Sequence, residues 1–180
     1  VHAAAGGVGS ILVQWAKHLG ARVIGTAGSE EKAELARGHG ADHVILYRDQ
    51  DVAAEVRRLT DGKGVPVAYD SVGAATFEGT MGSLARRGMF VSFGNASGPV
   101  PPFAPLRLSQ AGSLFFTRPT MFDYTATTED LDASAAALFE VITSGAVKID
   151  IGQTSALGDA RRAHEALEGR ETVGASLLVP

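Results

Sequence analysis

Short apolar stretches rich in β-branched residues alternate with helix-patterned segments between Val1 and Thr117. In the helical segments, apolar residues recur three or four positions apart, as Phe77, Met81 and Leu84 do. Such an alternation predicts a parallel sheet that is covered by helices on both faces. The chain is therefore expected to be α/β, with a doubly wound parallel sheet. The expected strands are residues 1–3, 22–26, 43–47, 65–70, 89–93 and 113–117. The expected helices are one that ends at Gly20 and three over residues 29–37, 51–59 and 75–85.

The pattern changes after Phe93, where a loop rich in glycine, proline and polar residues follows. A helix over residues 128–144 is expected next, with Leu131 and Phe139 among its inward-facing residues. The remaining expected elements are an apolar stretch at 147–151, a helix at 158–167 and a strand at 175–179. We expect residues 1–145 to form one domain. Residues 146–180 are too few for a core of their own and are expected to pack on chain that precedes Val1.

The composition excludes several classes of protein. A hydrophobic content of 45% with 20% charged residues is that of a globular domain and not of a disordered chain. The formal net charge of −4 argues against nucleic acid or an anionic membrane as the main partner. No apolar run has the length of about 20 residues that a spanning helix needs. The absence of cysteine excludes disulfides and thiolate metal sites, and His39 and His43 straddle a turn, so we expect no metal site.

A glycine-rich turn at the start of the chain indicates a phosphate-binding site. Gly6, Gly7 and Gly9 stand between the first apolar residues and a helix, and Ala4 occupies the usual position of the first glycine. Glycines there allow the backbone to approach a pyrophosphate, which lies at the N-terminus of the helix. A strand of about five residues normally precedes such a turn, and only about three are present. We therefore expect the chain to be part of a longer one, cut within or just before its first strand.

The residues that follow the second expected strand favour NADP(H) over NAD(H). Proteins that select NAD place an acidic residue about 20 positions after the turn, where it holds the ribose hydroxyls. Here Gly25 to Ser29 are small and neutral, and Lys32 follows one helical turn later. Glu30 and Glu31 oppose this interpretation, although acidic residues in a first helical turn commonly interact with the helix dipole.

Four motifs in register give the chain a resemblance to a known family. They are Ala3-Ala4-Ala5-Gly6-Gly7-Val8-Gly9, Tyr69-Asp70-Ser71-Val72-Gly73, Ser92-Phe93-Gly94-Asn95-Ala96-Ser97-Gly98 and Thr117-Arg118-Pro119. Together they resemble the zinc-independent quinone oxidoreductases (zeta-crystallin type) of the medium-chain dehydrogenase/reductase superfamily. The resemblance implies NADPH as cofactor and residues 1–145 as a Rossmann domain. It also implies an N-terminal GroES-like catalytic domain, absent here, on which residues 146–180 would pack.

The resemblance also implies which residues contact the cofactor. Ser29, Lys32 and Tyr47 match the neighbours of the 2′-phosphate and adenosine ribose, and Arg170 matches an arginine that reaches back to the cofactor. The full expected set is Ala5, Gly6, Gly7, Val8, Gly28, Ser29, Lys32, Tyr47, Ser71, Phe93, Gly94, Asn95, Ser97 and Arg170. Asp70 ends the expected strand at 65–70, where ligands of open sheets bind. Its alternative role is to cap the next helix. The segment from Ser113 to Arg118 matches the edge strand through which two subunits of the family form a homodimer.

The predicted activity is hydride transfer from NADPH to a quinone or a related enone, with residence in the cytoplasm. No residue of the chain stands out as a catalytic acid, so the catalytic residues stay unassigned. Two alternatives stay open, a non-catalytic NADPH-binding module of crystallin type and a related enoyl reductase or alcohol dehydrogenase. A methyltransferase on a similar sheet would need an acid after the second strand, and Gly25 to Gly28 provide none. The chain alone is expected to bind NADPH weakly and to turn over little.

Overall fold

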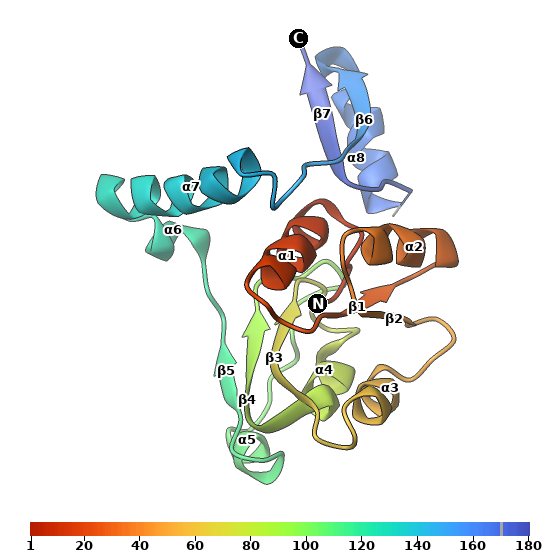
Figure 1. The fold of residues 1–180 in the computed structure, drawn as a ribbon, viewed down its shortest axis with the longest axis vertical. Coiled ribbons are helices and arrows are strands. Elements are labelled where there is room, and N and C mark those ends of the chain that lie inside the picture. The colour runs from red at the N-terminus through yellow and green to blue at the C-terminus, as the bar shows by residue number, and fades with distance from the viewer. Residues whose placement is uncertain (170) are drawn as a thin grey trace.

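The computed structural model describes residues 1–169 and 171–180 and has an α/β architecture (Figure 1). Its helices are α1 (Gly7–His18), α2 (Glu30–Gly38), α3 (Val52–Leu59), α4 (Phe77–Ser83), α5 (Leu106–Gln110), α6 (Met121–Tyr124), α7 (Thr128–Thr143) and α8 (Ala160–Glu168), with a 3-10 turn η1 (Leu157–Asp159). Its strands are β1 (Ile24–Ala27), β2 (His43–Leu46), β3 (Val65–Asp70), β4 (Leu84–Ser92), β5 (Phe115–Thr117), β6 (Ile151–Ala156) and β7 (Ala175–Val179).

The strands before α6 are parallel, and the first residues of the chain lie between two groups of them. β1 pairs with β2, and β3, β4 and β5 pair in that order. The Thr26 amide donates to the Val1 carbonyl at 3.0 Å, and the His2 amide donates to the Tyr69 carbonyl at 3.1 Å. The spatial order is therefore β2, β1, the N-terminal segment, β3, β4, β5, the order of a doubly wound dinucleotide-binding sheet. The predicted fold class is confirmed.

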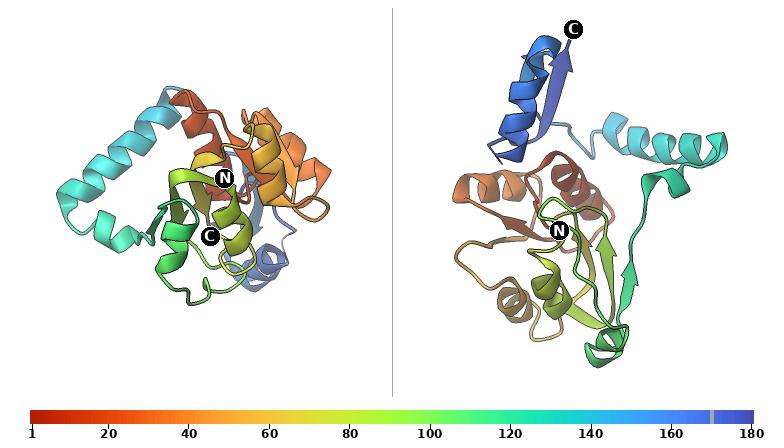
Figure 2. Two further views of the ribbon diagram at one scale, coloured as in Figure 1. Left: turned by 90° about the horizontal axis from the view of Figure 1, so that it is seen from below. Right: turned by 180° about the vertical axis from the view of Figure 1, so that it is seen from behind.

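Helices lie on both faces of this sheet (Figure 2). Apolar side chains between the helices and the strands form three buried clusters. One cluster, from α4 and the β3–β4–β5 strands, consists of Ala68, Phe77, Met81, Leu84, Phe90 and Leu114. A second, from α1 and α2, consists of Ala4, Val13, Val23, Ala36 and Ala41. A third, which includes α3, consists of Ile24, Ile45 and Val56. Helices on both faces explain why the strands are apolar along most of their length.

Two helices begin at the polar residues that the sequence indicates. The Ser29 hydroxyl accepts from the Lys32 amide at 3.3 Å, and the Asp51 carboxylate accepts from the Ala54 amide at 2.8 Å. Each satisfies one of the amides that a helix N-terminus leaves without an intrahelical acceptor. The N-termini of α2 and α3 therefore lie where they were predicted.

The segment from Ala75 to Phe93 differs from its prediction at two boundaries. The expected helix over residues 75–85 is shorter, because Leu84, buried to 1% exposure, pairs with Val65 and begins β4. The next pair is Val67 with Met89. Between the two pairs, β4 therefore has more residues than β3, and the register shifts. One of them, Arg87, has a left-handed φ of 58°. Regular pairing therefore starts at Met89, the residue predicted to begin the strand.

The inward face predicted for the helix after Thr127 is wrong in this structure. Leu131 is 50% exposed and Phe139 is 61% exposed, because α7 projects away from the sheet (Figure 1). Only Val141 of α7 is buried. The Val147 amide donates to the Val141 carbonyl at 2.9 Å and turns the chain back toward α1.

The last elements form a separate parallel pair of strands, β6 and β7, with α8 beside them (Figure 2). The chain reaches this strand pair next to α1, where the Gln14 side chain donates to the Lys148 carbonyl and accepts from the Lys148 amide, each at 2.9 Å. It touches the domain again at Gly174, whose amide donates to the Ala5 carbonyl at 3.3 Å. The outer surface of the strand pair is exposed, as Ile151 and Leu177 illustrate.

No helix in the described part of the chain is both long and apolar enough to cross a membrane.

Candidate dinucleotide-binding site

The glycine-rich turn connects the N-terminal segment to α1 and presents backbone amides at one edge of the sheet. The Gly6 amide donates to the Ala3 carbonyl at 2.9 Å, and the Ser10 amide donates to the Gly6 carbonyl at 2.8 Å. The amides of Gly7, Val8 and Gly9 therefore precede the first intrahelical bond of α1 and are oriented for an anion. Val8 is 59% exposed, so apolar packing does not cover this helix start.

Gly9 allows the turn to pack closely against the strand before it. A Cβ atom at Gly9 would lie 2.1 Å from the Ala3 carbonyl oxygen and 3.0 Å from the Ala4 Cα. Both are backbone atoms and cannot rotate away. Ala3 itself has a left-handed φ of 51°. The third glycine of the motif therefore serves helix–strand packing. A Cβ atom at Gly7 would lie 3.3 Å from the Gly174 carbonyl oxygen, so the segment at Gly174 packs against the turn.

The residues predicted to hold the adenosine end lie after β1 and β2. A Cβ atom at Gly28 would lie 2.5 Å from the Tyr47 hydroxyl oxygen, so the phenol of Tyr47 lies directly over Gly28. Ser29 accepts the Lys32 amide at the start of α2, which leaves the hydroxyl proton of Ser29 for donation to a ligand. The structure therefore brings Gly28, Ser29 and Tyr47 together, with the backbone of Lys32 beside them.

The residues predicted to line the nicotinamide end lie in two loops that are joined by backbone hydrogen bonds. The Ala96 amide donates to the Ser71 carbonyl at 3.2 Å, and the Ser97 amide donates to the Val72 carbonyl at 2.8 Å. The Ser97 hydroxyl also donates to the Val72 carbonyl at 2.8 Å and accepts the Ala75 amide at 2.9 Å. A Cβ atom at Gly94 would lie 2.5 Å from the Ser71 carbonyl oxygen. Ser71, Gly94 and Ser97 thus belong to one rigid wall, and Phe93 and Asn95 flank Gly94 in the same loop.

The two ends of the candidate site lie at the same edge of the sheet. All the predicted residues outside position 170 follow the carboxyl ends of parallel strands, and ligands of open α/β sheets bind at that edge. The glycine-rich turn lies between the ends, because the N-terminal segment is hydrogen bonded to β1 on one side and to Tyr69 of β3 on the other. The prediction for Arg170 lies outside the described residues.

Asp70 is fully buried and holds the turn that precedes α4. Its Oδ1 atom accepts the amides of Val72 and Gly73 at 2.8 and 3.0 Å, and its Oδ2 atom accepts the hydroxyls of Thr76 and Thr80 at 2.7 and 2.8 Å. Burial raises the pKa of Asp70, but the nearby His2 and these hydrogen bonds outweigh burial, so the pKa lies below its ordinary value. Asp70 therefore does not cap α4, whose N-cap residue is Thr76 and whose amides have no side-chain cap. It holds the turn before the helix through the amides of Val72 and Gly73.

His2 is a buried part of this region that the sequence did not reveal. Its Nε2 atom lies 2.8 Å from the Thr80 hydroxyl, and its Nδ1 atom lies 3.1 Å from the Thr26 hydroxyl. Burial lowers the pKa of His2 to about 4, although the charge of Asp70 opposes this shift. His2 is therefore neutral at pH 7. The sequence indicates only that His2 is a polar residue within an apolar strand segment. It does not indicate which residues His2 contacts.

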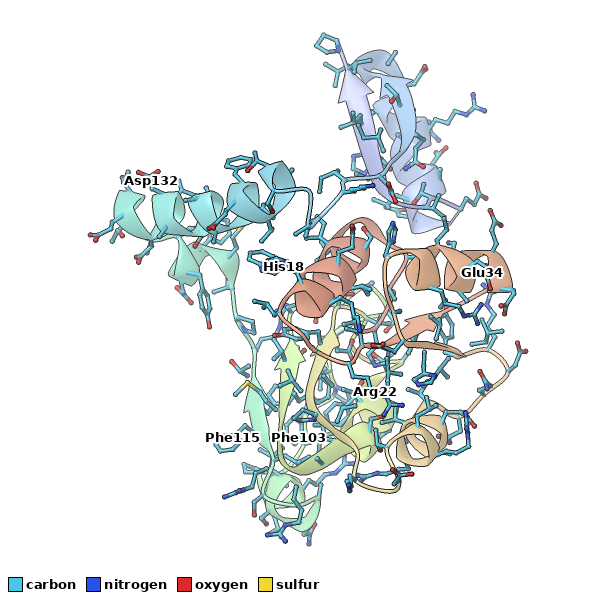
Figure 3. The ribbon with its side chains drawn as sticks, in the orientation of Figure 1. His18, Arg22, Glu34, Phe103, Phe115 and Asp132 are labelled. Carbon is cyan, nitrogen blue, oxygen red and sulfur yellow. The ribbon has the colours of Figure 1, made fainter. Side chains whose placement is uncertain are left out.

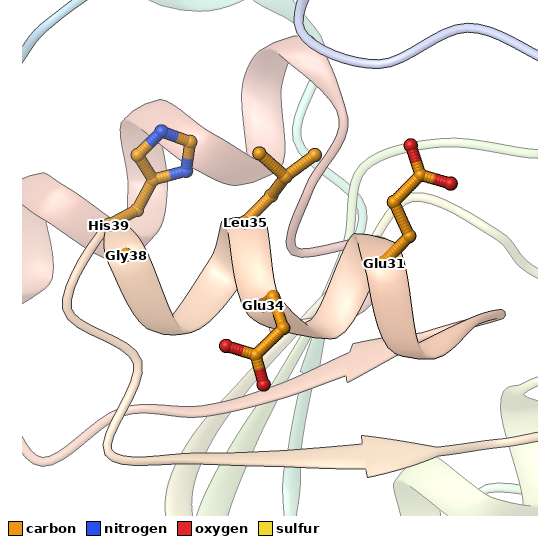
Figure 4. Close-up of a pocket in the computed structure, with 5 residues that line it drawn as sticks. All are labelled: Glu31, Glu34, Leu35, Gly38 and His39. Carbon is orange, nitrogen blue, oxygen red and sulfur yellow. The ribbon is translucent and has the colours of Figure 1, made fainter.

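Two depressions in the described surface lie away from the strand ends. One follows the outer side of α2 and is lined by Glu31, Glu34, Leu35, Gly38 and His39 (Figure 4). Its two carboxylates make it unfavourable for a phosphate-bearing ligand. The Nε2 atom of His39 pairs with Asp150 at 2.5 Å. No group of three or more histidine, aspartate or glutamate side chains among the described residues could hold a metal ion.

The parallel sheet, the glycine-rich turn and the two strand-end loops define a dinucleotide-binding domain of the Rossmann class. The sequence model of the zinc-binding dehydrogenase family matches residues 7–140. The chain belongs to this family. Because its described residues offer no ligand set for zinc, we derive no chemistry from that metal.

Known proteins confirm the resemblance to quinone oxidoreductases. A quinone oxidoreductase of Salmonella typhimurium is 52% identical over 99% of this chain and 55% of its own length. The crystal structure of Escherichia coli quinone oxidoreductase in complex with NADPH matches with a TM-score of 0.95 and 50% identity, over 99% of this chain and 56% of that one. A 2-haloacrylate reductase of a Burkholderia species is 44% identical over 100% of this chain and 54% of its own length. The chain thus spans about half the length of these relatives.

Proposed function

We propose that this chain is the NADPH-binding part of an enzyme that transfers a hydride from NADPH to a quinone or a related enone. The observation that carries the proposal is the arrangement at the strand ends, where an adenosine side and a nicotinamide side flank a glycine-rich helix N-terminus. The relative from Escherichia coli, solved with NADPH, supports the identity of the cofactor. NADPH, when bound, supplies the hydride.

The residues of the chain have separate tasks in this proposal. The turn residues Ala5, Gly6, Gly7 and Val8 hold the pyrophosphate through backbone amides and the dipole of α1. Gly28, Ser29, Lys32 and Tyr47 hold the adenosine ribose and its 2′-phosphate. Ser71, Phe93, Gly94, Asn95 and Ser97 hold the nicotinamide and keep water away from its hydride-bearing face. From the resemblance alone, we also assign Arg170 to the cofactor.

The selectivity for NADPH follows from the end of β1. Thr26, Ala27 and Gly28 carry no acidic side chain, so a 2′-phosphate meets no repulsion from the strand end. The hydroxyl of Ser29 and the ammonium of Lys32 are suited to bind that phosphate, and charge-assisted hydrogen bonds are the strong ones. The chain therefore selects NADPH through favourable contacts to its 2′-phosphate, and not by repelling NADH.

Three further statements belong to the same proposal. Residues 1–145 form the cofactor-binding domain, and residues 146–180 pack on an N-terminal catalytic domain that completes the pocket for the substrate. The enzyme works without zinc, as a homodimer joined through the edge strand from Ser113 to Arg118. It resides in the cytoplasm and has no nucleic acid or membrane as partner.

A titration of the purified chain with NADPH and with NADH, followed by nicotinamide fluorescence, tests the proposal. We expect weak but clear binding with a preference for NADPH, and little turnover of a quinone such as 1,4-benzoquinone. In the longer protein that carries the catalytic domain, we expect tight NADPH binding and rapid quinone reduction. Binding of neither nucleotide by the chain and the longer protein would refute the cofactor assignment. Binding without turnover by the longer protein would favour a non-catalytic module.

A second substrate class is favoured by one relative. The 2-haloacrylate reductase from Burkholderia is 44% identical to this chain. By its name it reduces an activated acrylate, in which, as in a quinone, a carbon–carbon double bond is conjugated to a carbonyl group. A comparison of NADPH oxidation by the longer protein with 1,4-benzoquinone and with 2-chloroacrylate separates the two classes. Faster turnover of the acrylate would replace the quinone in the proposal.

A further inference from the structure

A continuous chain of buried polar side chains runs between the two sides of the candidate site. It starts at Thr26 on β1, passes through His2 and Thr80, and ends at Asp70 on β3. The exposed fractions are 4% for Thr26, 7% for His2 and 0% for Thr80 and Asp70. The members come from two strands, the N-terminal segment and α4, which lie together around the middle of the sheet (Figure 1). We refer to these four residues as the buried polar chain.

The hydrogen bonds of the buried polar chain have one consistent direction. Asp70 is ionised and can only accept, so the Thr80 hydroxyl donates to its Oδ2 atom. The remaining lone pair of Thr80 then accepts from His2, which requires the proton of the neutral imidazole on Nε2. The Nδ1 atom of His2 is consequently an acceptor, and the Thr26 hydroxyl donates to it. The Thr80 hydroxyl also lies 2.8 Å from the Thr76 carbonyl, but its single proton goes to the charged Asp70, and this orientation joins the four residues into one directed network.

Both ends of the buried polar chain lie next to residues of the candidate site. Thr26 is two residues before Gly28, which lies under the Tyr47 hydroxyl. Asp70 immediately precedes Ser71, and its carbonyl accepts the Phe93 amide at 2.9 Å. The carboxylate of Asp70 also fixes the amides of Val72 and Gly73 in the loop after β3. A shift of Thr80 or His2 therefore changes the position of one side of the site relative to the other.

We propose that His2 and Thr80 are positioning residues that fix the spacing between the adenosine side and the nicotinamide side of the site. The inference rests on the proposed function, because it concerns the same cofactor. Neither residue needs to touch the cofactor. A dinucleotide gains affinity when both of its halves fit at once, since the second half then binds at a high effective concentration. A site whose halves are misplaced still binds each half, but it loses this gain.

The substitution Thr80→Val tests the inference with two ligands. Valine keeps the shape of threonine but removes the hydroxyl that joins His2 to Asp70. We expect the Kd for NADPH to increase by a factor of about ten or more. The Kd for adenosine 2′,5′-bisphosphate, which fills the adenosine side only, is expected to change less than twofold. Thr80→Ser restores the hydroxyl and is expected to restore NADPH binding.

Ser83→Ala is the matched control on the same helix. Ser83 is also buried, but its hydroxyl donates only to the Gly79 carbonyl of its own helix at 2.7 Å. This variant is expected to bind both ligands like the wild type. Thr26→Val, at the other end of the buried polar chain, is expected to reproduce the effect of Thr80→Val and serves if that variant does not fold.

Three outcomes would contradict the inference or its basis. Unchanged NADPH binding by folded Thr80→Val or Thr26→Val would overturn the inference alone. An equal loss for NADPH and adenosine 2′,5′-bisphosphate would assign the residues a merely structural role and overturn it as well. Failure of both the wild-type chain and the longer protein to bind NADPH would overturn the proposed function and, with it, the inference.

Discussion

The phenol of Tyr47 lies over Gly28, so close that a single methyl group at Gly28 would meet its hydroxyl oxygen at 2.5 Å. This contact joins the ends of two neighbouring strands, β1 and β2. It positions a partly exposed aromatic ring at the adenosine side of the candidate site. The contact is specific enough to be tested by substitution.

Gly28→Ala is expected to weaken NADPH binding without unfolding the protein. The added Cβ collides with the outer end of a side chain that is 39% exposed, so Tyr47 can rotate outward at little cost in stability. We expect the Kd for NADPH to rise about tenfold, which corresponds to about 1.4 kcal/mol, with a nearly unchanged melting temperature. Fluorescence titration and a thermal melt measure the two quantities. A large loss of stability with intact binding would show that Tyr47 supports the fold and not the site.

Gly9→Ala, in contrast, is expected to destabilise the fold itself. The new Cβ would lie 2.1 Å from the backbone oxygen of Ala3, which cannot move without the strand. Overpacking of this kind costs about 1–3 kcal/mol or more, measurable as a lower midpoint of urea unfolding. The control is Gly38→Ala at the end of α2, where a Cβ would meet nothing within 4 Å. That variant should be as stable as the wild type or slightly more stable, by up to about 1 kcal/mol. Equal midpoints for Gly9→Ala and the wild type would refute the packing role of Gly9.

Lys32→Gln is expected to reduce the preference for NADPH. Loss of one charge-assisted contact to the 2′-phosphate should raise the Kd for NADPH about tenfold and leave the Kd for NADH unchanged. Lys63→Gln is the control, because Lys63 lies in the exposed segment before β3, at the opposite edge of the sheet from the strand ends. A parallel loss of affinity for both nucleotides would mean that Lys32 acts on something other than the phosphate.

The buried imidazole of His2 makes stability depend on pH. Burial lowers its pKa from 6.5 to about 4 in the folded protein, so below pH 6.5 the unfolded chain binds a proton that the folded protein does not. The free energy of unfolding therefore decreases as the pH falls from 7 to 5, by about 2 kcal/mol from this group. The depressed pKa of Asp70 contributes only below its ordinary value of 3.8, outside this range. Urea unfolding at the two pH values measures the effect.

Two variants separate His2 from the other histidines in this measurement. His2→Gln should reduce the difference between pH 7 and pH 5 by about 2 kcal/mol, and His18→Gln, at an exposed position on α1, should leave it unchanged (Figure 3). An unchanged pH dependence in His2→Gln would show that another group titrates in this range.

Phe115→Lys is expected to dissociate the proposed homodimer. Phe115 is 57% exposed on β5, which pairs only with β4 among the described strands, and a lysine on an edge strand opposes edge-to-edge pairing (Figure 3). Phe139→Lys removes a phenylalanine of similar exposure, 61%, from α7, away from the strand edge. Sedimentation velocity of the longer protein should give a monomer for the first variant and a dimer for the second. The reverse result would move the dimer interface to α7.

The sequence predicts the elements whose signals are local. β3 has the predicted bounds, and α2 and α3 start beside Ser29 and Asp51, because a cap acts over three residues. The glycine-rich turn is equally local. These features together are sufficient for the fold class and for the residues at the edge of the sheet.

The rest depends on contacts between distant parts of the chain. His2 and Thr80 are 78 positions apart, and no local pattern could pair them. The extra residues within β4 follow from its pairing with β3, which shifts register after Val65. α7 has the periodicity of a buried helix, but in this structure Phe139 has no surface to bury against. In each case the missing information is the identity of the partner.

The hydrogen bond from Gly174 to Ala5 gives the outer strand pair a mechanical link to the phosphate turn. The Ala175 amide donates to the Asp150 carbonyl at 2.8 Å, so the excursion through β6 and α8 starts and closes at one pivot beside that turn. Gly174, with φ of 62°, and Gly152, whose Cβ would lie 1.8 Å from the Val173 oxygen, form this pivot. β6 and β7 run in parallel, and both start beside this pivot. The strand pair is therefore attached to the domain at Ala5, the residue that begins the glycine-rich turn.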